Sequence, residues 1–167
     1  IDFLKANDGR IMINPWDAKM LEKIKTNVYD HKLTPHIVWP HKYMADYKNG
    51  SATIADSDVA YHEFHINWEC RGVQCKSLLD GLTLNFKNKK AIIYDLKTTQ
   101  KLWHFEDSID QYDYLRQLCY YKKAVLWYLE NECREDSLTW DFEFYIIGID
   151  TTGTSEIRVF KIESDRV

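Results

Sequence analysis

The sequence predicts an α/β fold in which a central mixed β-sheet is flanked by helices. Two stretches, 16–29 and 110–130, carry apolar residues at helical spacing. Three strand-like stretches lie between them, and two more follow the second helix. Helices and strands in this order pack as helices on the faces of a sheet. We expect one domain over 1–167, because 167 residues fit a single hydrophobic core. The chain starts at Ile1 rather than Met, which leaves room for an upstream segment.

The first helix is expected to begin at Pro15, with Asn14 as its N-cap, because proline suits the first helical position and asparagine suits the cap. Its apolar side chains then recur every three or four residues: Met20, Leu21, Ile24 and Val28. A polar loop is expected over 46–57, before the first strand.

The middle of the chain predicts three strands joined by two turns. The first strand covers 61–70 and ends at a turn signal, Arg71-Gly72. The second covers 73–86 and leads into the polar turn 87–90. The third, 91–96, reads AIIYDL, and this short apolar run suits a buried central strand.

A long helix and two strands complete the predicted fold. The helix covers 110–130, with three capping groups near its start: Asp107, Ser108 and Asp110. The last two strands are expected at 140–149 and 156–162, on either side of the turn residues 151–153.

Composition limits the classes of function. The net charge is −4, so no global positive field attracts nucleic acid and any DNA contact needs a local patch. The densest basic cluster lies in the turn 87–90, where solvated lysines are the expected state and phosphate contact is the alternative. No apolar run reaches the length of a membrane span. The four cysteines lack zinc or iron–sulfur spacing and are expected to be reduced thiols of an intracellular protein: Cys70, Cys75, Cys119 and Cys133.

Three charged residues of the middle strands carry the chemical hypothesis: Asp80, Asp95 and Lys97. Asp95 and Lys97 are two positions apart in a strand, so they share a face, and a hairpin would bring Asp80 beside Asp95. A carboxylate at the end of an apolar strand is costly without a partner. Mg²⁺ is such a partner, since one or two carboxylates typically hold it together with water and phosphate. The alternative interpretation is a plain surface ion pair between Asp95 and Lys97.

A longer pattern surrounds these residues. Asp80-Gly81 precedes a hairpin, an apolar strand then leads into D-L-K-T-T from Asp95, and the later helix contains Q-x-x-x-Y at Gln117 and Tyr121. This pattern resembles the RecB-type branch of the PD-(D/E)XK nucleases, and within it the phage and prophage exonucleases of the exonuclease VIII type. The resemblance covers the stretch 63–129, and its parts are jointly fairly specific.

The resemblance implies a restriction-endonuclease-like core and a set of site residues. Asp80 and Asp95 would bind Mg²⁺, for which Mn²⁺ would substitute, and the carbonyl of Leu96 would be a further ligand. Lys97 would be the catalytic lysine. Gln117 and Tyr121, which lie one helical turn apart, would position that lysine or contact a phosphate.

The resemblance also implies one more metal ligand upstream. Glu63 resembles the glutamate found at this point in relatives. His62 and Glu69 are alternatives, and a histidine before Ile1 is another.

The function that follows is hydrolysis of DNA phosphodiesters by an exodeoxyribonuclease acting on duplex ends in recombination or repair. The resemblance places such an enzyme in the cytoplasm of a bacterial or phage-infected cell, away from membranes, as a homo-oligomer or with a single-strand annealing or recombination partner. Two alternatives stay open: an endonuclease or nickase of the same superfamily, and a catalytically silent DNA-binding module. More side chains are candidate DNA contacts, with structural roles as the alternative: Thr98, Thr99, and an aromatic of the segment Trp103-His104-Phe105.

Overall fold

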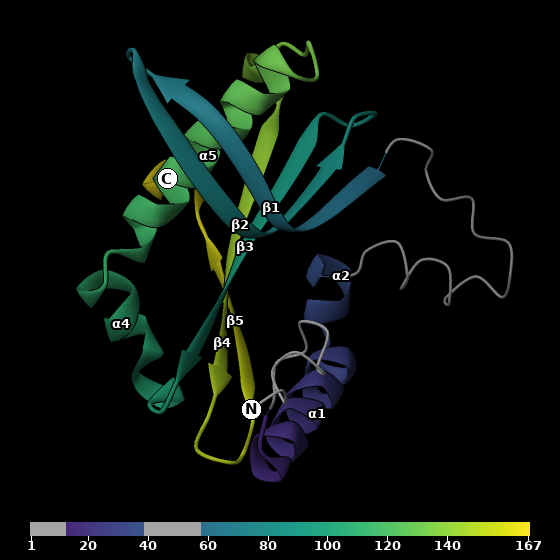
Figure 1. Ribbon diagram of the computed structural model, residues 1–167, viewed down its shortest axis with the longest axis vertical. Coiled ribbons are helices and arrows are strands. Elements are labelled where there is room, and N and C mark those ends of the chain that lie inside the picture. Colours follow the sequence, from purple (N-terminus) through teal and green to yellow (C-terminus); the bar gives the residue numbers. More distant parts are fainter. Residues whose placement is uncertain (1–12, 39–57) are drawn as a thin grey trace, which may run out of the picture.

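The computed structural model describes residues 13–38 and 58–167. Within these residues, five strands form one sheet in the order β1-β2-β3-β4-β5 (Figure 1). The strands are β1 (Asp58–Cys70), β2 (Val73–Asn85), β3 (Lys90–Thr99), β4 (Asp141–Asp150) and β5 (Ile157–Ile162). The α-helices are α1 (Pro15–Asp30), α2 (Thr34–Val38), α4 (Phe105–Gln111) and α5 (Tyr114–Asn131). The 3-10 turns are η1 (Leu102–His104), η2 (Ser137–Thr139) and η3 (Ser164–Arg166).

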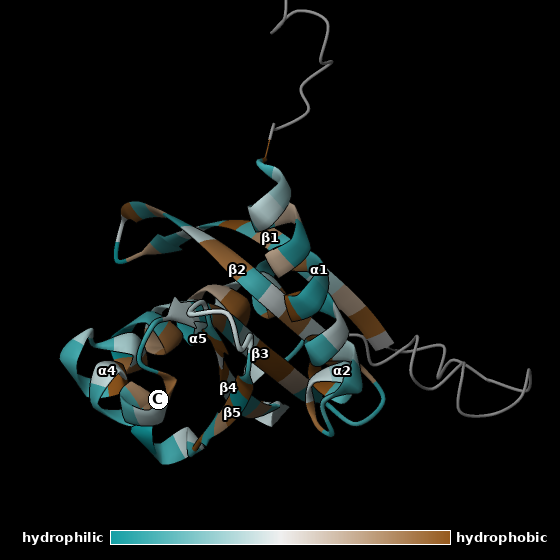
Figure 2. Ribbon diagram, turned by 90° about the horizontal axis from the view of Figure 1, so that it is seen from below, coloured by the Kyte–Doolittle hydropathy of each residue, from teal (hydrophilic) through white to brown (hydrophobic). Residues whose placement is uncertain are grey.

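The sheet is mixed, and helices lie on both of its sides. Neighbouring strands are antiparallel except β3 and β4, which run parallel from Lys90–Asp141 to Thr99–Asp150. A parallel pair needs a crossover, and the crossover here contains α4 and α5. Figure 2 shows α4 and α5 on one side of the sheet and α1 and α2 on the other. The predicted α/β fold with a central mixed sheet flanked by helices is confirmed, and it is consistent with a restriction-endonuclease-like core.

Each face of the sheet has its own hydrophobic core. The larger core joins α4 and α5 to side chains of all five strands, with Leu118, Val125 and Leu129 of α5 fully buried in it. The smaller core joins Val28 of α1 and the end of α2 to the opposite face. Among the described residues, no helix is long and apolar enough to cross a membrane.

The first hairpin changes face halfway along its length. Its register stays constant, from Tyr61 opposite Leu82 to Phe64 opposite Leu79. Both Leu79 and Leu82 nevertheless pack in the larger core, although strict alternation would place residues three apart on opposite faces. The change occurs at Glu63, which has a left-handed φ of 47°. The distortion in β1 therefore lies opposite Asp80 in β2.

Most predicted elements are confirmed, and two differ. The side chain of Asn14 caps α1 by accepting a hydrogen bond from the Asp17 N–H (2.8 Å). The helix predicted at 110–130 is wrong at its start, since α4 ends at Gln111 and α5 begins at Tyr114. The break occurs at Asp113, whose φ of 55° no right-handed helix can contain, so the expected capping groups lie inside α4. The short helix α2 was not predicted, and the polar loop 46–57 lies outside the described residues.

Gly81 is required by the ring of Tyr94. The two residues are paired between β2 and β3, and a Cβ added at Gly81 would overlap the Tyr94 ring. The ring extends across β2, and its hydroxyl is 2.8 Å from Nδ1 of His62 on β1. Three strands are thus joined at the position next to Asp80.

We expect Gly81→Ala to lower the free energy of unfolding by about 1–3 kcal/mol, because overpacking forces a rigid buried ring to move. Urea denaturation measures the loss. In a Tyr94→Leu background the cost of Gly81→Ala should be much smaller, because the ring is gone. In a Tyr94→Phe background the cost should stay, because the ring is still present. An equal cost of Gly81→Ala in all three backgrounds would contradict the steric explanation.

The β4–β5 turn is organised by Asp150. Its carboxylate accepts hydrogen bonds from the N–H groups of Thr152 (3.1 Å), Thr154 (3.2 Å) and Ser155 (3.2 Å), and from the hydroxyls of both threonines. Burial alone would raise the pKa of Asp150, but these hydrogen bonds outweigh it and lower the pKa to about 2. The side chain of Asn27 on α1 donates to the carbonyl of Ser155 (2.6 Å), so the turn also holds α1.

Asp150→Asn should destabilise the protein at neutral pH by about 1–3 kcal/mol, because it removes the charge that these donors stabilise. The native pKa of about 2 lies below the ordinary value of 3.8. The stabilisation is therefore complete above about pH 4 and is lost as the pH falls towards 2. Urea denaturation across this range should show wild type and variant converging, with the exposed Asp165→Asn as the control. A difference between Asp150→Asn and wild type that does not change with pH would argue against this.

Candidate functional site

The candidate site lies where β2 separates from β3. The last paired residues of the two strands are Gly81 and Tyr94, while β3 continues along β4 as far as Thr99. At the next position of β2, a carboxylate oxygen of Asp80 accepts a hydrogen bond from the N–H of Leu96 (2.7 Å). This hydrogen bond replaces the missing strand pairing and holds Asp80 beside Asp95, as the predicted hairpin requires.

Asp95 is a buried carboxylate, with only 2% of its surface exposed. Its Oδ2 forms an ion pair with the ammonium of Lys97 but no well-directed hydrogen bond. Its Oδ1 accepts a hydrogen bond from the side-chain amide of Gln117 (3.3 Å). Burial raises the pKa of Asp95; Lys97 opposes this shift, and the charge of Asp80 adds to it. The buried carboxylate is therefore stabilised by the Lys97 ammonium, and the second negative charge, on Asp80, adds to the cost of burying it.

Lys97 has two partners on the α5 side of the sheet. Its side chain is 20% exposed, and its ammonium contacts Asp95. The ammonium also lies 4.9 Å from the centre of the Tyr114 ring, at the first residue of α5. The predicted shared face of Asp95 and Lys97 is confirmed, and a plain surface pair is excluded by the burial of Asp95.

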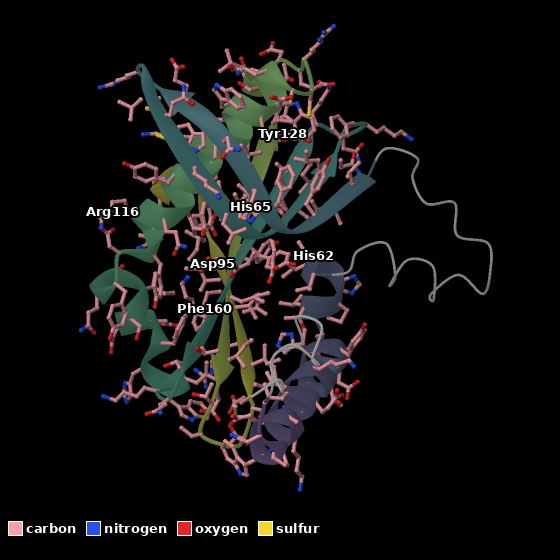
Figure 3. All side chains as sticks on the ribbon, viewed as in Figure 1. His62, His65, Asp95, Arg116, Tyr128 and Phe160 are labelled. Atoms are coloured by element: carbon pink, nitrogen blue, oxygen red, sulfur yellow. The ribbon has the colours of Figure 1, made fainter. Side chains whose placement is uncertain are left out.

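Gln117 and Tyr121 face the same point from α5. The amide of Gln117 donates to the hydroxyl of Tyr121 (2.6 Å) as well as to Asp95. Burial, with the nearby charge of Asp95, raises the pKa of Tyr121 to about 12. The phenol therefore stays protonated at neutral pH, close to the charge of Asp95. In Figure 3, Asp95 lies at the centre of the molecule, with Arg116 of α5 to one side and His62 to the other.

Glu63 is not gathered into this cluster. It lies across from Asp80 on β1, exposed and in its left-handed conformation. Within residues 13–38 and 58–167, no group of three or more His, Cys, Asp or Glu side chains is arranged to hold a metal ion. Of the alternatives, His62 contacts Tyr94, and Glu69 accepts a hydrogen bond from Gln74 (3.1 Å).

Three residues of the site were missed by sequence reasoning: Gly81, Tyr94 and Tyr114. Gly81 follows Asp80 and Tyr94 precedes Asp95, so their position beside a predicted site aspartate could have indicated both residues. The sequence pattern includes Gly81 but assigns it no role of its own. Tyr114 falls within the predicted helix 110–130, and helical spacing alone does not show that its ring contacts an ammonium group.

The other candidate DNA contacts are distributed differently. In the turn 87–90, Lys89 pairs with Glu135, and Lys90 pairs with Glu143 (3.1 Å), which favours the structural interpretation for both. Trp103 is 73% exposed, which excludes a core role, and the guanidinium of Arg158 lies 3.8 Å from the centre of its ring. The four cysteines are free thiols.

A scan against models of protein families and a search of curated proteins return no match for this chain.

Asp80 and Asp95 fit a magnesium ion as donors. Both are carboxylates, the oxygen ligands that Mg²⁺ prefers, and one or two of them suffice when water and phosphate complete the coordination. The structural observation that supports the fit is that two carboxylates, one of them buried, lie together beside the ammonium of Lys97. A second cation would offset the negative charge that one ammonium leaves. Leu96 lies between Asp95 and Lys97 in β3, next to the same carboxylates.

Lys97→Met should lower the free energy of unfolding by about 3 kcal/mol, because it leaves the buried Asp95 carboxylate without its positive partner. Chemical denaturation at neutral pH measures this loss, and adding Asp95→Asn should recover most of it. The control is Lys90→Met, which breaks the more exposed pair with Glu143 and should cost about 1 kcal/mol or less. Similar losses in the two lysine variants would show that the burial of Asp95 does not decide the effect.

Proposed function

We propose that this protein is a Mg²⁺-dependent deoxyribonuclease that hydrolyses phosphodiester bonds, most consistent with an exodeoxyribonuclease acting on duplex DNA ends. The observation that carries the proposal is the convergence of Asp80, Asp95 and Lys97 at the point where β2 leaves β3. Two carboxylates and one ammonium, placed together where the sheet opens, match the needs of metal-assisted phosphoryl chemistry. The sequence resemblance of 63–129 to PD-(D/E)XK nucleases supports the same reaction.

Each residue of the site has a role in this proposal. Asp80 and Asp95 would hold the ion, with Mn²⁺ as a substitute and the Leu96 carbonyl as a further ligand. When bound, the metal would supply Lewis acidity at a phosphate oxygen and would lower the pKa of the attacking water. Lys97 orients the attacking water or neutralises charge that develops on the phosphate. Gln117 fixes the orientation of the Asp95 carboxylate through its Oδ1 hydrogen bond.

Tyr121 and Glu63 have secondary places in the proposal. The protonated phenol of Tyr121 completes the hydrogen bonds around Gln117, so it is a positioning residue. Glu63 would become a ligand only if β1 changed its conformation at this position, so we assign the metal to the two aspartates. As an exonuclease, the protein would act in the cytoplasm of a bacterial or phage-infected cell, as a homo-oligomer or with a recombination partner.

The test is incubation of linear and closed-circular plasmid with Mg²⁺ or Mn²⁺. Digestion of linear DNA alone supports the exonuclease, and nicking of the circle supports the endonuclease alternative. Asp80→Ala, Asp95→Ala and Lys97→Ala should each lower the rate by at least about 100-fold, because each removes a charge that the transition state needs.

The matched control is Glu143→Gln, which removes an acid of the same sheet that is paired with lysines away from the site. It should cut DNA at the wild-type rate. Undiminished cleavage by Asp95→Ala or Lys97→Ala would defeat both enzymatic interpretations. Tight DNA binding without cleavage under any divalent metal would favour the catalytically silent module.

A further inference from the structure

An open groove of about 470 Å³ leads away from the candidate site. One wall is β2 around Lys76, and the other is formed by the end of α4 and the first turns of α5. Gln117 and Tyr121 belong both to this groove and to the cluster around Asp95. A molecule bound along the groove would therefore have one end beside the buried carboxylate.

Two exposed aromatic rings line this groove. Tyr112 is 61% exposed and stacks on Tyr114, with their ring centres 5.8 Å apart. Tyr120 is 53% exposed and contacts the buried Trp68 at an angle, with 6.3 Å between ring centres. The Tyr112 ring is stacked on another aromatic ring, whereas the Tyr120 ring meets Trp68 edge to face and has the ammonium of Lys123 5.9 Å from its centre. More than half of each tyrosine is exposed and can accept a flat ligand.

Two cationic residues line the same groove. Lys76 is exposed on β2, and the Arg116 side chain is 72% exposed on α5. Figure 3 shows Arg116 directed away from the helix into solvent. The Nε of Arg116 is paired with Asp113 at 3.1 Å. An exposed ion pair of this kind is weak, so it orients the guanidinium without preventing a phosphate from binding it.

We infer that the groove binds the single-stranded part of a DNA substrate, with bases stacked on Tyr112 and Tyr120 and phosphates bound by Lys76 and Arg116. This inference rests on the proposed nuclease function of the Asp95 site. Exposed rings alternating with cations suit an unpaired strand, since every unpaired base offers a flat face for stacking. The bases of a duplex are stacked on one another and present only their edges and the backbone. The groove thus favours one strand over two and directs it towards the carboxylates.

The experiment is fluorescence anisotropy of a labelled oligothymidylate and of a labelled blunt duplex in EDTA, where no cleavage occurs. Tyr112→Ala/Arg116→Ala should bind the single strand roughly tenfold more weakly than wild type, because it loses one stacking platform and one phosphate contact. The slope of log K against log salt should become shallower by about 0.7 for the lost contact. Arg116→Glu, which leaves the aromatic packing intact, should also weaken binding and guards against misfolding of the α4–α5 junction.

The control is Trp16→Ala/Lys19→Ala, which removes one exposed aromatic and one exposed cation from α1 on the other side of the sheet. It should bind as wild type does. The inference is overturned if both groove variants bind the single strand with wild-type affinity, or if the wild type itself does not bind it. It is also overturned if the groove variants lose as much affinity for the duplex as for the single strand.

The two proposals fail separately. If the groove variants lose single-strand binding and the wild-type protein cuts no DNA with Mg²⁺, the groove assignment is supported and the nuclease proposal is wrong. A protein that cuts DNA while both groove variants bind and cut single strands as wild type does would sink the groove assignment alone.

Discussion

The site depends on the electrostatic cost of one buried carboxylate. Asp95 lies in β3 between a pairing partner on β4 and the helix α5, and only 2% of its surface reaches solvent. Its charge is tolerated because Lys97 and Gln117 both contact the carboxylate. In addition, the hydrogen bond from the Leu96 N–H restrains the second carboxylate, Asp80, so that it does not move closer. A cluster of this kind is a poor way to stabilise a fold, since replacing buried ion pairs with apolar side chains is often neutral or stabilising. Its presence where β3 leaves the apolar run Ala91–Tyr94 is therefore the feature on which the proposed function rests.

The fold opens the sheet at the point where this cluster lies. Strand β2 pairs with β3 only up to Gly81, and the first hairpin changes face at Glu63 and Asp80. A left-handed residue costs roughly 1–2 kcal/mol in place of ordinary strand geometry, so it persists only where its surroundings fix it. The Tyr94 ring, which crosses Gly81 to reach His62, is one such constraint. The same few contacts that distort the hairpin thus turn Asp80 towards Asp95.

The sequence predicted what depends on local pattern and missed what depends on tertiary contacts. Periodicity two placed Asp95 and Lys97 on one face, and helical spacing placed Gln117 and Tyr121 together. Neither pattern predicts the break between the two helices at Asp113. One left-handed residue hardly changes the spacing of the apolar residues on either side of it. Nor could pattern show that Glu63 stays outside the cluster, since its position depends on how two strands twist around each other. Of the residues expected to bind the metal, the structure places Asp80 and Asp95 next to each other and Glu63 apart from them.

The break at Asp113 has a consequence for access to the site. A continuous helix from Phe105 to Asn131 would have kept its side chains in register along one axis, with Tyr112 about one turn from Arg116. Because the chain turns at Asp113, α4 and α5 diverge, and the exposed ring of Tyr112 stands at the rim of the groove instead of on the flank of the long helix. The ammonium of Lys97 lies over the ring of Tyr114, the first residue after the break, and Tyr112 stacks on the same ring. The short segment 112–114 therefore positions both the lysine of the candidate site and the nearest exposed ring of the groove. The proposed groove and the candidate site therefore meet at the junction of α4 and α5. A substitution that straightened this junction would move Tyr112 in the groove and Tyr114 beside Lys97 together.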